Sequence, residues 1–355
     1  MDSIVCSCRP GFETEAGQEI VEKAAALGVF GFFKPVFTGG LVFRASDSAA
    51  LTRIWRDLHC KDLVFTRDWW QLIEVTMLPQ TDRVGAVVAA LSDLDQPLPK
   101  ATGRMEAIVP DGVDDPSLHR FAKKWTPPLS RALKDAGILS PGSDAGHRLE
   151  LLLPGFDKVW LCWSDANNRA PFSAGVARLR QPPEAPSRSS LKLEEAWHVF
   201  FGRDQFLQQL GGGQQAVDLG AAPGGWTWQL VNQGMMVTAV DNGPMAPDLM
   251  ASGHVTHVRA DGFSWRPRRA VDWLVCDMVE QPRRVAALMA AWVREGLCRH
   301  AIFNLKLPMK QRYAEWQLCE ALILDQLAEA GIEVRLAAKH LYHDREEITC
   351  YLERV

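Results

Sequence analysis

Apolar and polar positions in the second half of the chain alternate between strand-like and helical patterns. Helical patterns are clearest at 282–296 and 312–331, and another lies at 191–201. Strands that alternate with helices favour a parallel sheet with right-handed crossovers, so this half predicts a Rossmann-like domain with a mostly parallel sheet. Only a loop joins the last two strands, and the final strand is therefore expected to run antiparallel at or beside an edge. Seven apolar runs predict the strands, at 216–220, 235–241, 255–260, 271–276, 301–307, 333–338 and 348–352.

The first half of the chain has a different pattern. A strand at 3–10, a helix at 13–27 and a strand at 39–46 predict a β-α-β unit. Neither this unit nor the one that follows contains a glycine-rich loop or a cluster of catalytic residue types. The polar and aromatic stretch at 119–125 is compatible with a surface that faces RNA and equally with a scaffold surface. The second α+β unit is predicted from runs at 62–75, 82–91, 103–111, 116–136, 147–155 and 158–164.

A segment rich in Pro, Ser, Asn and Arg separates the two halves. Residues 164–190 have neither a helical nor a strand period, which is typical of a linker. The predicted organisation is thus an N-terminal α+β region at 1–163, a linker at 164–190 and a Rossmann-like domain at 191–355.

Length and composition agree with this division. A chain of 355 residues favours two or three domains, and 47% hydrophobic with 23% charged residues is ordinary for a well-packed protein. No apolar run approaches the roughly 20 residues that span a bilayer, and the first residues do not resemble a signal peptide. The eight cysteines form no C-x-x-C pair, which predicts a reduced, cytoplasmic protein without a metal site.

The net charge of −4 argues weakly against nucleic-acid binding, but local charge matters more, because screening limits attraction to about 8–10 Å. Two stretches are basic. Residues 178–192 carry four cationic side chains against Glu184, and residues 299–312 carry four with no acid. Either stretch taken alone is adequately explained as a solvated face.

The motif DLGAAPGG at 218–225 follows the first strand of the Rossmann-like domain, where open α/β sheets bind nucleotides. The spacing of its glycines does not match G-x-G-x-x-G, so a dinucleotide is disfavoured. Asp241 lies 21 residues after Gly220, where a carboxylate grips a ribose diol, and Asp261 follows the third strand, where it could accept from an adenine amino group. A nucleoside without a pyrophosphate points to S-adenosyl-L-methionine.

Four charged residues fall at ends of elements that this sheet could bring together. They are Lys192, Asp277, Lys306 and Glu347. Lys306 lies in the apolar run IFNLKLP, where an unpaired ammonium group is costly, although a lysine that snorkels at a strand end would explain it as well. Two lysines and two carboxylates can compensate one another when they are buried together.

These motifs resemble a known family. DLGAAPGGW, CDM, NLKLPM and EEITCYL, with Lys192 ahead of them, are similar to the ribose 2′-O-methyltransferases that carry a Lys-Asp-Lys-Glu tetrad. CRPGFE, APSRSSLKLEEAWHVF, VDNGPM, FNLKLPMKQRY and LYHDREE resemble, more specifically, the bacterial enzymes that methylate a cytidine ribose in 23S ribosomal RNA. This similarity spans nearly the entire chain, and it implies that the N-terminal region is a THUMP-type RNA-binding module with a ferredoxin-like part.

The resemblance implies a role for individual residues. Ala222, Pro223, Gly224 and Gly225 would line the methionine portion of S-adenosyl-L-methionine, Asp241 would hold its ribose and Asp261 its adenine. Asp277 would lie beside the methyl donor and the catalytic lysine, and Ser189 would reach the cofactor. Trp226 could pack nearby or belong to the core. Either Glu346 or Glu347 faces inward, because side chains alternate along a strand.

The chemistry of ribose methylation explains why these residue types are needed. A 2′-hydroxyl stays protonated at neutral pH, so a positioned base must take its proton as the methyl group is attacked in line. A lysine can act as that base only if its pKa falls, which burial and a second cation both promote. We assign Lys306 as the base and Lys192 as its cationic neighbour, with Asp277 and Glu347 orienting the lysines and the hydroxyl. The leaving group becomes neutral, so no metal is required.

Three other classes of protein are compatible with parts of this sequence. An RNA-binding ribosome-assembly factor with an inactive methyltransferase fold is the main alternative, and it would not need all four tetrad residues. A nicotinamide-dependent oxidoreductase is disfavoured by the glycine spacing, and a small-molecule methyltransferase by the large N-terminal region. The target nucleotide rests on the resemblance alone. We expect a monomer that acts on 23S ribosomal RNA without a membrane or an obligate protein partner.

Overall fold

The structure is a computed structural model, and it describes residues 3–94, 102–140, 146–202 and 206–355. The chain forms two compact units, Met1–Val176 and Ala177–Val355. The boundary falls within the predicted linker at 164–190, although β7 continues to Asp165 and a short 3-10 turn at Ser173–Gly175 packs against β4 of the first unit. Among the described helices, none is both long and apolar enough to cross a membrane.

The first part of unit 1 has a ferredoxin-like order of elements. It consists of β1 (Ser3–Cys8), α1 (Glu13–Ala26), β2 (Gly31–Phe37), β3 (Gly40–Ala45), α2 (Leu51–Asp57) and β4 (Thr66–Met77). The strands lie in the order β2-β3-β1-β4, and every neighbouring pair is antiparallel. The sequence patterns predicted β1, α1 and β3 but missed β2 and α2, because Pro35 and two glycines interrupt the apolar alternation around β2.

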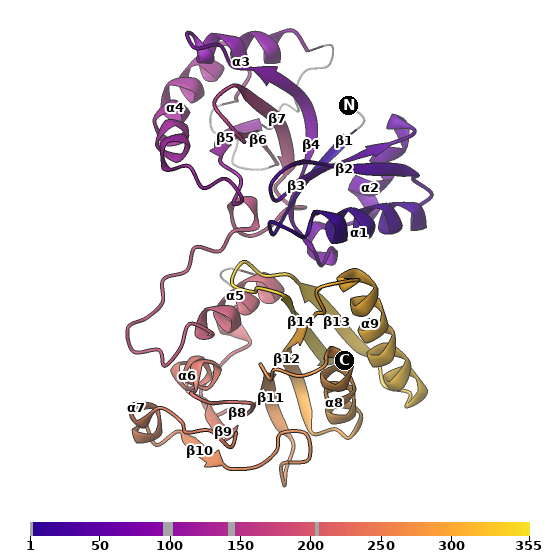
Figure 1. The fold of residues 1–355 in the computed structure, drawn as a ribbon, viewed down its shortest axis with the longest axis vertical. Coiled ribbons are helices and arrows are strands. Elements are labelled where there is room, and N and C mark those ends of the chain that lie inside the picture. The colour runs from indigo at the N-terminus through magenta and orange to yellow at the C-terminus, as the bar shows by residue number, and fades with distance from the viewer. Residues whose placement is uncertain (1–2, 95–101, 141–145, 203–205) are drawn as a thin grey trace. The chain divides into compact units, whose positions relative to one another are not determined.

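The second part of unit 1 continues the same sheet. Its elements are α3 (Arg83–Ser92), β5 (Thr102–Ile108), α4 (Pro116–Asp135), β6 (His147–Leu152) and β7 (Lys158–Asp165). The long strand β4 pairs with β1 through its first residues and with β7 through its last residues. The two α+β units predicted from sequence are therefore joined by β4 into one seven-stranded sheet, in the order β2-β3-β1-β4-β7-β6-β5 (Figure 1).

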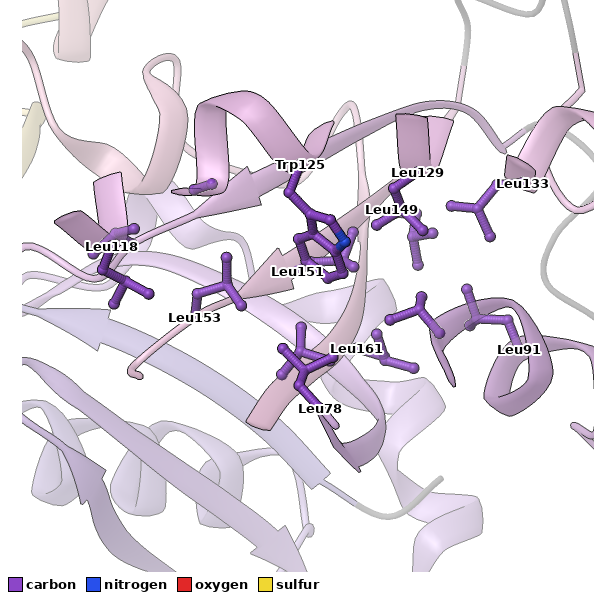
Figure 2. Close-up of a cluster of buried hydrophobic side chains, with 14 of the residues drawn as sticks. Leu78, Leu91, Leu118, Trp125, Leu129, Leu133, Leu149, Leu151, Leu153 and Leu161 are labelled. Carbon is purple, nitrogen blue, oxygen red and sulfur yellow. The ribbon is translucent and has the colours of Figure 1, made fainter. Parts of the chain in front are cut away.

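A leucine-rich core holds the second part of unit 1 together. Trp125, Leu129 and Leu133 recur along α4 at helical spacing, and Leu149 and Leu151 alternate along β6. Figure 2 shows these side chains meeting Leu91 of α3 and Leu161 of β7. Since each of these side chains is at most 5% exposed, α4 is held in place mainly by burial of its apolar face.

Unit 2 is a Rossmann-like sheet of seven strands in the order β10-β9-β8-β11-β12-β14-β13. The five strands from β10 to β12 are parallel, and β14 is antiparallel to both of its neighbours. The predicted antiparallel last strand is confirmed, and it lies beside the edge strand β13. The strands are β8 (Gln215–Leu219), β9 (Met236–Val240), β10 (Val255–Val258), β11 (Val271–Cys276), β12 (Cys298–Lys306), β13 (Val334–Lys339) and β14 (Glu347–Arg354).

Helices cover both faces of this sheet. Figure 1 shows α5 and α6 on one face and α8 and α9 on the other. Trp197, Trp226 and Trp273 join α5, α6 and β11 in one apolar cluster, which makes Trp226 a core residue. The helices are α5 (Ser190–Phe201), α6 (Gly225–Asn232), α7 (Pro247–Ala251), α8 (Pro282–Arg294) and α9 (Arg312–Glu329). Because β8, β11 and β12 are parallel, the residues that follow them meet at one edge of the sheet, which is formed by the carboxyl ends of these strands.

Candidate active site

The four predicted tetrad residues lie together at this edge of the sheet. Asp277 directly follows β11, Lys306 is the last residue of β12, and Glu347 is the first residue of β14. The antiparallel register pairs Lys306 with Glu347, so their side chains project to the same side. Lys192 lies in the first turn of α5 and reaches the same point from the helix.

The tetrad is a closed set of ion pairs. Lys306 Nζ is 2.5 Å from Asp277 Oδ1 and 3.8 Å from Glu347 Oε1. Lys192 Nζ is 3.5 Å from Asp277 Oδ2 and also donates to Glu347 Oε1. Each lysine thus contacts both carboxylates. Since all four side chains are no more than 22% exposed, water screens these contacts only partly.

The surroundings of the tetrad fix the charge of two of its members. Burial alone would lower the pKa of Lys192, but Asp277 and Glu347 outweigh it and raise that pKa above its ordinary value. Burial alone would raise the pKa of Glu347, but Lys192 and Lys306 lower it to about 2. Near neutral pH, Lys192 is therefore positively charged and Glu347 negatively charged.

The two neighbouring glutamates of β14 have opposite environments. Glu347 is buried, and its Oε2 accepts a hydrogen bond from the Glu346 backbone N–H at 3.1 Å. Glu346 has a side chain that is 53% exposed and pairs with Arg312 at 2.7 Å. The structure thus selects Glu347 as the inward residue, as strand alternation required of one of the two.

An acidic cavity of about 460 Å³ adjoins the tetrad. It is bounded by the loops that follow β8, β9, β10 and β11, and Asp277 belongs both to its wall and to the tetrad. The described residues that line it include Asp241, Asp261 and Glu280 but neither lysine nor arginine. A pyrophosphate would lack cationic partners here, whereas a nucleoside that carries a positive charge would be complemented.

Asp241 and Asp261, the residues predicted to bind the ribose and the adenine, both line this cavity. Asp241 Oδ2 accepts from the Ala222 backbone N–H at 3.0 Å, and its Oδ1 accepts from Gly243 N–H at 2.7 Å. These two bonds hold the Asp241 carboxylate in one orientation toward the cavity. Asp261 is exposed, and its Oδ1 accepts from Phe263 N–H at 3.0 Å.

The glycine loop fits closely against its neighbours. Gly220 has φ +74°, and an added Cβ would overlap the side chain of Met278. A Cβ on Gly225 would overlap the hydroxyl groups of Ser187 and Ser189, which lie 2.6 Å apart. Ser189 is thus placed against the loop at the N-terminus of α6. Of the residues predicted to bind the cofactor, Ala222, Asp241, Asp261 and Asp277 line the cavity, whereas Ser189, Pro223, Gly224 and Gly225 lie outside its lining.

Sequence reasoning missed several polar residues that support the site. Asn304 donates to Asp277 Oδ1 at 2.8 Å, and it lies two residues before Lys306, so strand alternation could have placed it on the same face. Glu195 of α5 accepts from the backbone N–H groups of Tyr342 and His343 at 2.7 and 2.9 Å and thereby ties down the loop before β14. A charged residue inside an apolar run was the available signal for Glu195, in KLEEAW, and for Asp218, in AVDLG.

Asp218 lies beneath the glycine loop. Burial raises the pKa of its carboxyl to about 7, and Thr227 Oγ1 donates to Asp218 Oδ2 at 2.6 Å. This contact joins the end of β8 to the first turn of α6, so Asp218 and Thr227 stabilise the loop from its buried side.

The fold and the site together define a class of protein. Residues 185–324 match the family described as FtsJ-like methyltransferase, and residues 1–70 match the RlmM ferredoxin-like domain. Unit 2 is accordingly a methyltransferase domain, and its methyl donor is S-adenosylmethionine.

The relatives narrow this class to one family. The chain is 55% identical to the ribosomal RNA large subunit methyltransferase M of Marinobacter nauticus, and the match covers 100% of both chains. It is 47% identical to the protein of the same name from Stutzerimonas stutzeri, again over 100% of both. The crystal structure of TrmN from Thermus thermophilus matches 100% of both chains at 14% identity, with a TM-score of 0.35. The chain belongs to the ribosomal RNA large subunit methyltransferase M family.

Proposed function

We propose that this enzyme methylates the ribose 2′-hydroxyl of a cytidine in 23S ribosomal RNA, with Lys306 as the general base. One observation carries the proposal: Asp277 lies both in the wall of the acidic cavity and in an ion-pair cluster with two lysines. A group bound in the cavity and a hydroxyl at Lys306 would therefore meet at one carboxylate. The names of the relatives, which match over the full length of this chain, support ribosomal RNA of the large subunit as the substrate.

The residues present fit S-adenosylmethionine. We assign Asp241 to the ribose diol, Asp261 to the adenine amino group and Asp277 to the region of the sulfonium, with the glycine loop beside the methionine portion. When bound, this cofactor supplies an electrophilic methyl group whose departure leaves a neutral thioether. The four carboxylates of the lining favour its positive charge.

The tetrad can then move one proton. Lys306 in its neutral form removes the proton of the 2′-hydroxyl as the oxygen attacks, which is the role of a general base. Lys192 keeps its positive charge and stays between Asp277 and Glu347, so both carboxylates keep a cationic partner while Lys306 is neutral. Glu347 and Asp277 hold the two lysines apart and orient them toward the hydroxyl.

We assign recognition of the RNA chiefly to the N-terminal unit, since the described residues of the tetrad and of the cavity lining all belong to unit 2. The enzyme would act as a monomer in the cytoplasm, where ribosomal RNA is modified.

The test is a methylation assay with 23S ribosomal RNA transcribed in vitro and S-adenosylmethionine that carries a labelled methyl group. After digestion to nucleosides, we expect the label in 2′-O-methylcytidine. Label in a base-methylated nucleoside would contradict the assignment of ribose chemistry, and label in 16S but not in 23S transcripts would contradict the substrate. A protein that binds the RNA but transfers no label would instead be an assembly factor with an inactive methyltransferase fold.

A further inference from the structure

A row of buried polar side chains lies behind Asp277. Asn304 on β12 and Thr349 on β14 face each other across the antiparallel pair, and Asp344 lies in the loop before β14; each of the three residues is 0% exposed. Asn304 Nδ2 is 2.8 Å from Asp277 Oδ1, and Thr349 Oγ1 is 2.8 Å from Asn304 Oδ1. Asp344 Oδ1 is 3.1 Å from the same Thr349 hydroxyl. The contacts therefore form a chain from Asp344 to the tetrad.

The chemistry of these groups fixes the direction of every hydrogen bond. Asp277 accepts hydrogen bonds from two lysines, so the amide nitrogen of Asn304, and not its oxygen, must face it. The amide oxygen of Asn304 then faces Thr349, whose single hydroxyl proton is used to satisfy it. Thr349 consequently has no proton left for Asp344, and two oxygen acceptors at 3.0–3.1 Å would repel each other.

The contact between Asp344 and Thr349 is favourable only if Asp344 carries the proton. The backbone N–H of Leu341 donates to Asp344 Oδ2 at 3.0 Å, which leaves Oδ1 as the oxygen best placed to donate. We propose that Asp344 is a neutral carboxylic acid and that Asp344, Thr349 and Asn304 form a one-way hydrogen-bond chain that positions Asp277. As a claim about catalysis, this inference rests on the proposed function.

The electrostatics around Asp344 agree with the geometry. Burial raises the pKa of Asp344 well above its ordinary value, and the nearby anions Glu347 and Glu195 raise it further, while the cation Lys192 acts in the opposite direction. A neutral Asp344 also keeps the charges of the site balanced, with two lysines against Asp277 and Glu347. An ionised Asp344 would add a third anion to this buried group.

The protonation of Asp344 can be measured without any assay of activity. The substitution Asp344→Asn keeps the shape and the donor but removes the acid. A difference infrared spectrum of the full chain, wild type minus Asp344→Asn at neutral pH, is expected to contain the carbonyl band of a protonated carboxyl group. A carboxylate band in its place would overturn the proposal. We also expect Asp344→Asn to leave the pH profile of kcat unchanged, whereas a displaced profile would show that the charge of Asp344 matters.

The positioning role is tested at Thr349. Thr349→Val is nearly isosteric but breaks the chain, so kcat for RNA methylation is expected to fall ten- to a hundredfold, with little change in the Kd for S-adenosylmethionine. Thr349→Ser restores the hydroxyl and should recover most of the rate. Equal rates for the Val variant and wild type would overturn the positioning role, as would a Ser variant that is as slow as Val. If wild type itself transfers no methyl group, the proposed function fails, while the infrared result still decides the protonation of Asp344.

A second, independent inference concerns the edge strand β2 of unit 1. Phe30 and Phe32 are 69% and 60% exposed, whereas Phe33 between β2 and α1 packs over Gly17. Ser46 N–H donates to the Phe30 carbonyl at 2.8 Å, so Phe30 continues the pairing of β2 with β3. Phe30 and Phe32 therefore project from the face of the sheet opposite to α1.

Cations lie on the same face. Arg44 of β3 is opposite Phe32 in the register, and Lys34 lies two residues beyond Phe32 on β2; both are exposed. Residues two apart on a strand are separated by about 7 Å, which allows each ring to support a separate base. Aromatic rings on a sheet with cations beside them are suited to unpaired RNA, because bases stack on the rings while phosphates meet the charges.

We infer that Phe30, Phe32, Lys34 and Arg44 form a docking surface for a single-stranded segment of the RNA substrate. This inference also rests on the proposed function. A second copy of the chain is the other occupant that an edge strand could take, but it would not need the two cations.

The test compares Phe32→Ala with Leu318→Ala, which removes an apolar side chain that is 50% exposed in unit 2. Fluorescence anisotropy of the full chain with a short labelled oligouridine is expected to show about tenfold weaker binding for Phe32→Ala and wild-type binding for Leu318→Ala. Equal affinities for the two variants would overturn the inference, as would a wild-type dimer that Phe32→Ala dissociates without loss of RNA affinity. A wild type that binds neither oligouridine nor 23S ribosomal RNA would contradict the proposed function itself.

Discussion

Asp277 accepts hydrogen bonds from Lys306, Asn304 and Lys192, while its side chain also lines the acidic cavity. A carboxylate with this many donors is held in one rotamer. Its position explains why two chemical tasks can share one residue: one oxygen orients a lysine, and the side chain as a whole contributes negative potential to the place where a cationic methyl donor would lie.

Asp241 provides a test of the cofactor site at the scale of one residue. Its carboxylate is oriented by two backbone N–H groups and lines the cavity. Asp241→Ala is expected to weaken S-adenosylmethionine binding by about 1–3 kcal/mol, the size of a lost hydrogen bond to a charged group. Isothermal titration calorimetry measures this directly, with Asp248→Ala as an exposed control in the same part of the chain. Unchanged affinity would remove Asp241 from the site.

Glu347 predicts a dependence of stability on pH. Its pKa is depressed to about 2 from an ordinary 4.5, so its contribution is fully present above pH 4.5 and is lost as the pH falls toward 2. At pH 7 the depression corresponds to about 3 kcal/mol, as an order of magnitude. Glu347→Gln should therefore be less stable than wild type at pH 7, and the difference should shrink below pH 4.5. Urea unfolding followed at several pH values checks this. A difference that stays constant down to pH 3 would count against the ion pairs.

At the scale of elements, the glycine loop joins β8 to α6 and is packed from both sides. Gly225→Ala places a Cβ on the hydroxyl groups of Ser187 and Ser189, so it should destabilise unit 2 by about 1–3 kcal/mol and weaken S-adenosylmethionine binding. Gly211→Ala is the matched control, because a Cβ there has no neighbour within 4 Å among the described residues. Thermal unfolding and calorimetry of both variants measure the two effects. If Gly225→Ala behaves like Gly211→Ala, the close fit of the loop is not needed.

Elements with a strong local pattern could be predicted from the sequence. The strands of unit 2 are short apolar runs separated by helical patterns, and each was predicted within a few residues of its bounds. β2 and α2 were missed because Pro35 breaks the strand pattern and α2 has only seven residues. The sharing of β4 between two parts of unit 1 is a long-range pairing, which no local pattern records.

In the candidate site, too, the sequence could predict what a local pattern marks but not what depends on long-range contacts. Asp277 and Lys306 could be selected because charges at the ends of parallel strands converge on one edge. Lys192 and Glu347 could be added because they also fall at ends of elements, a helix and the last strand. Strand alternation could have placed Asn304 on the face of Lys306, but Thr349 and Asp344 could not be selected, because their importance depends on the register between β12 and β14 and on the path of the loop before β14. Polar residues of this kind become visible only when their hydrogen-bond partners are known.

At the scale of the whole molecule, chemistry and RNA recognition are assigned to different units. Residues 177–355 form a compact unit that contains the cavity and the tetrad. This fragment should bind S-adenosylmethionine about as tightly as the full chain but methylate 23S ribosomal RNA much more slowly at low RNA concentration. Calorimetry and methyl-transfer rates measured over a range of RNA concentrations separate the two effects. Equal rates at every concentration would refute the division of labour.

The substitution Lys306→Arg tests whether Lys306 removes the proton of the 2′-hydroxyl. Arginine keeps the positive charge but cannot readily lose its proton in a protein, so it cannot act as the base. Single-turnover methylation of 23S ribosomal RNA by the full chain is expected to slow by ~10²–10⁴, the usual share of a general base, while calorimetry shows nearly unchanged affinity for S-adenosylmethionine. A turnover rate close to that of wild type would contradict the account and leave Lys306 as an electrostatic partner of Asp277.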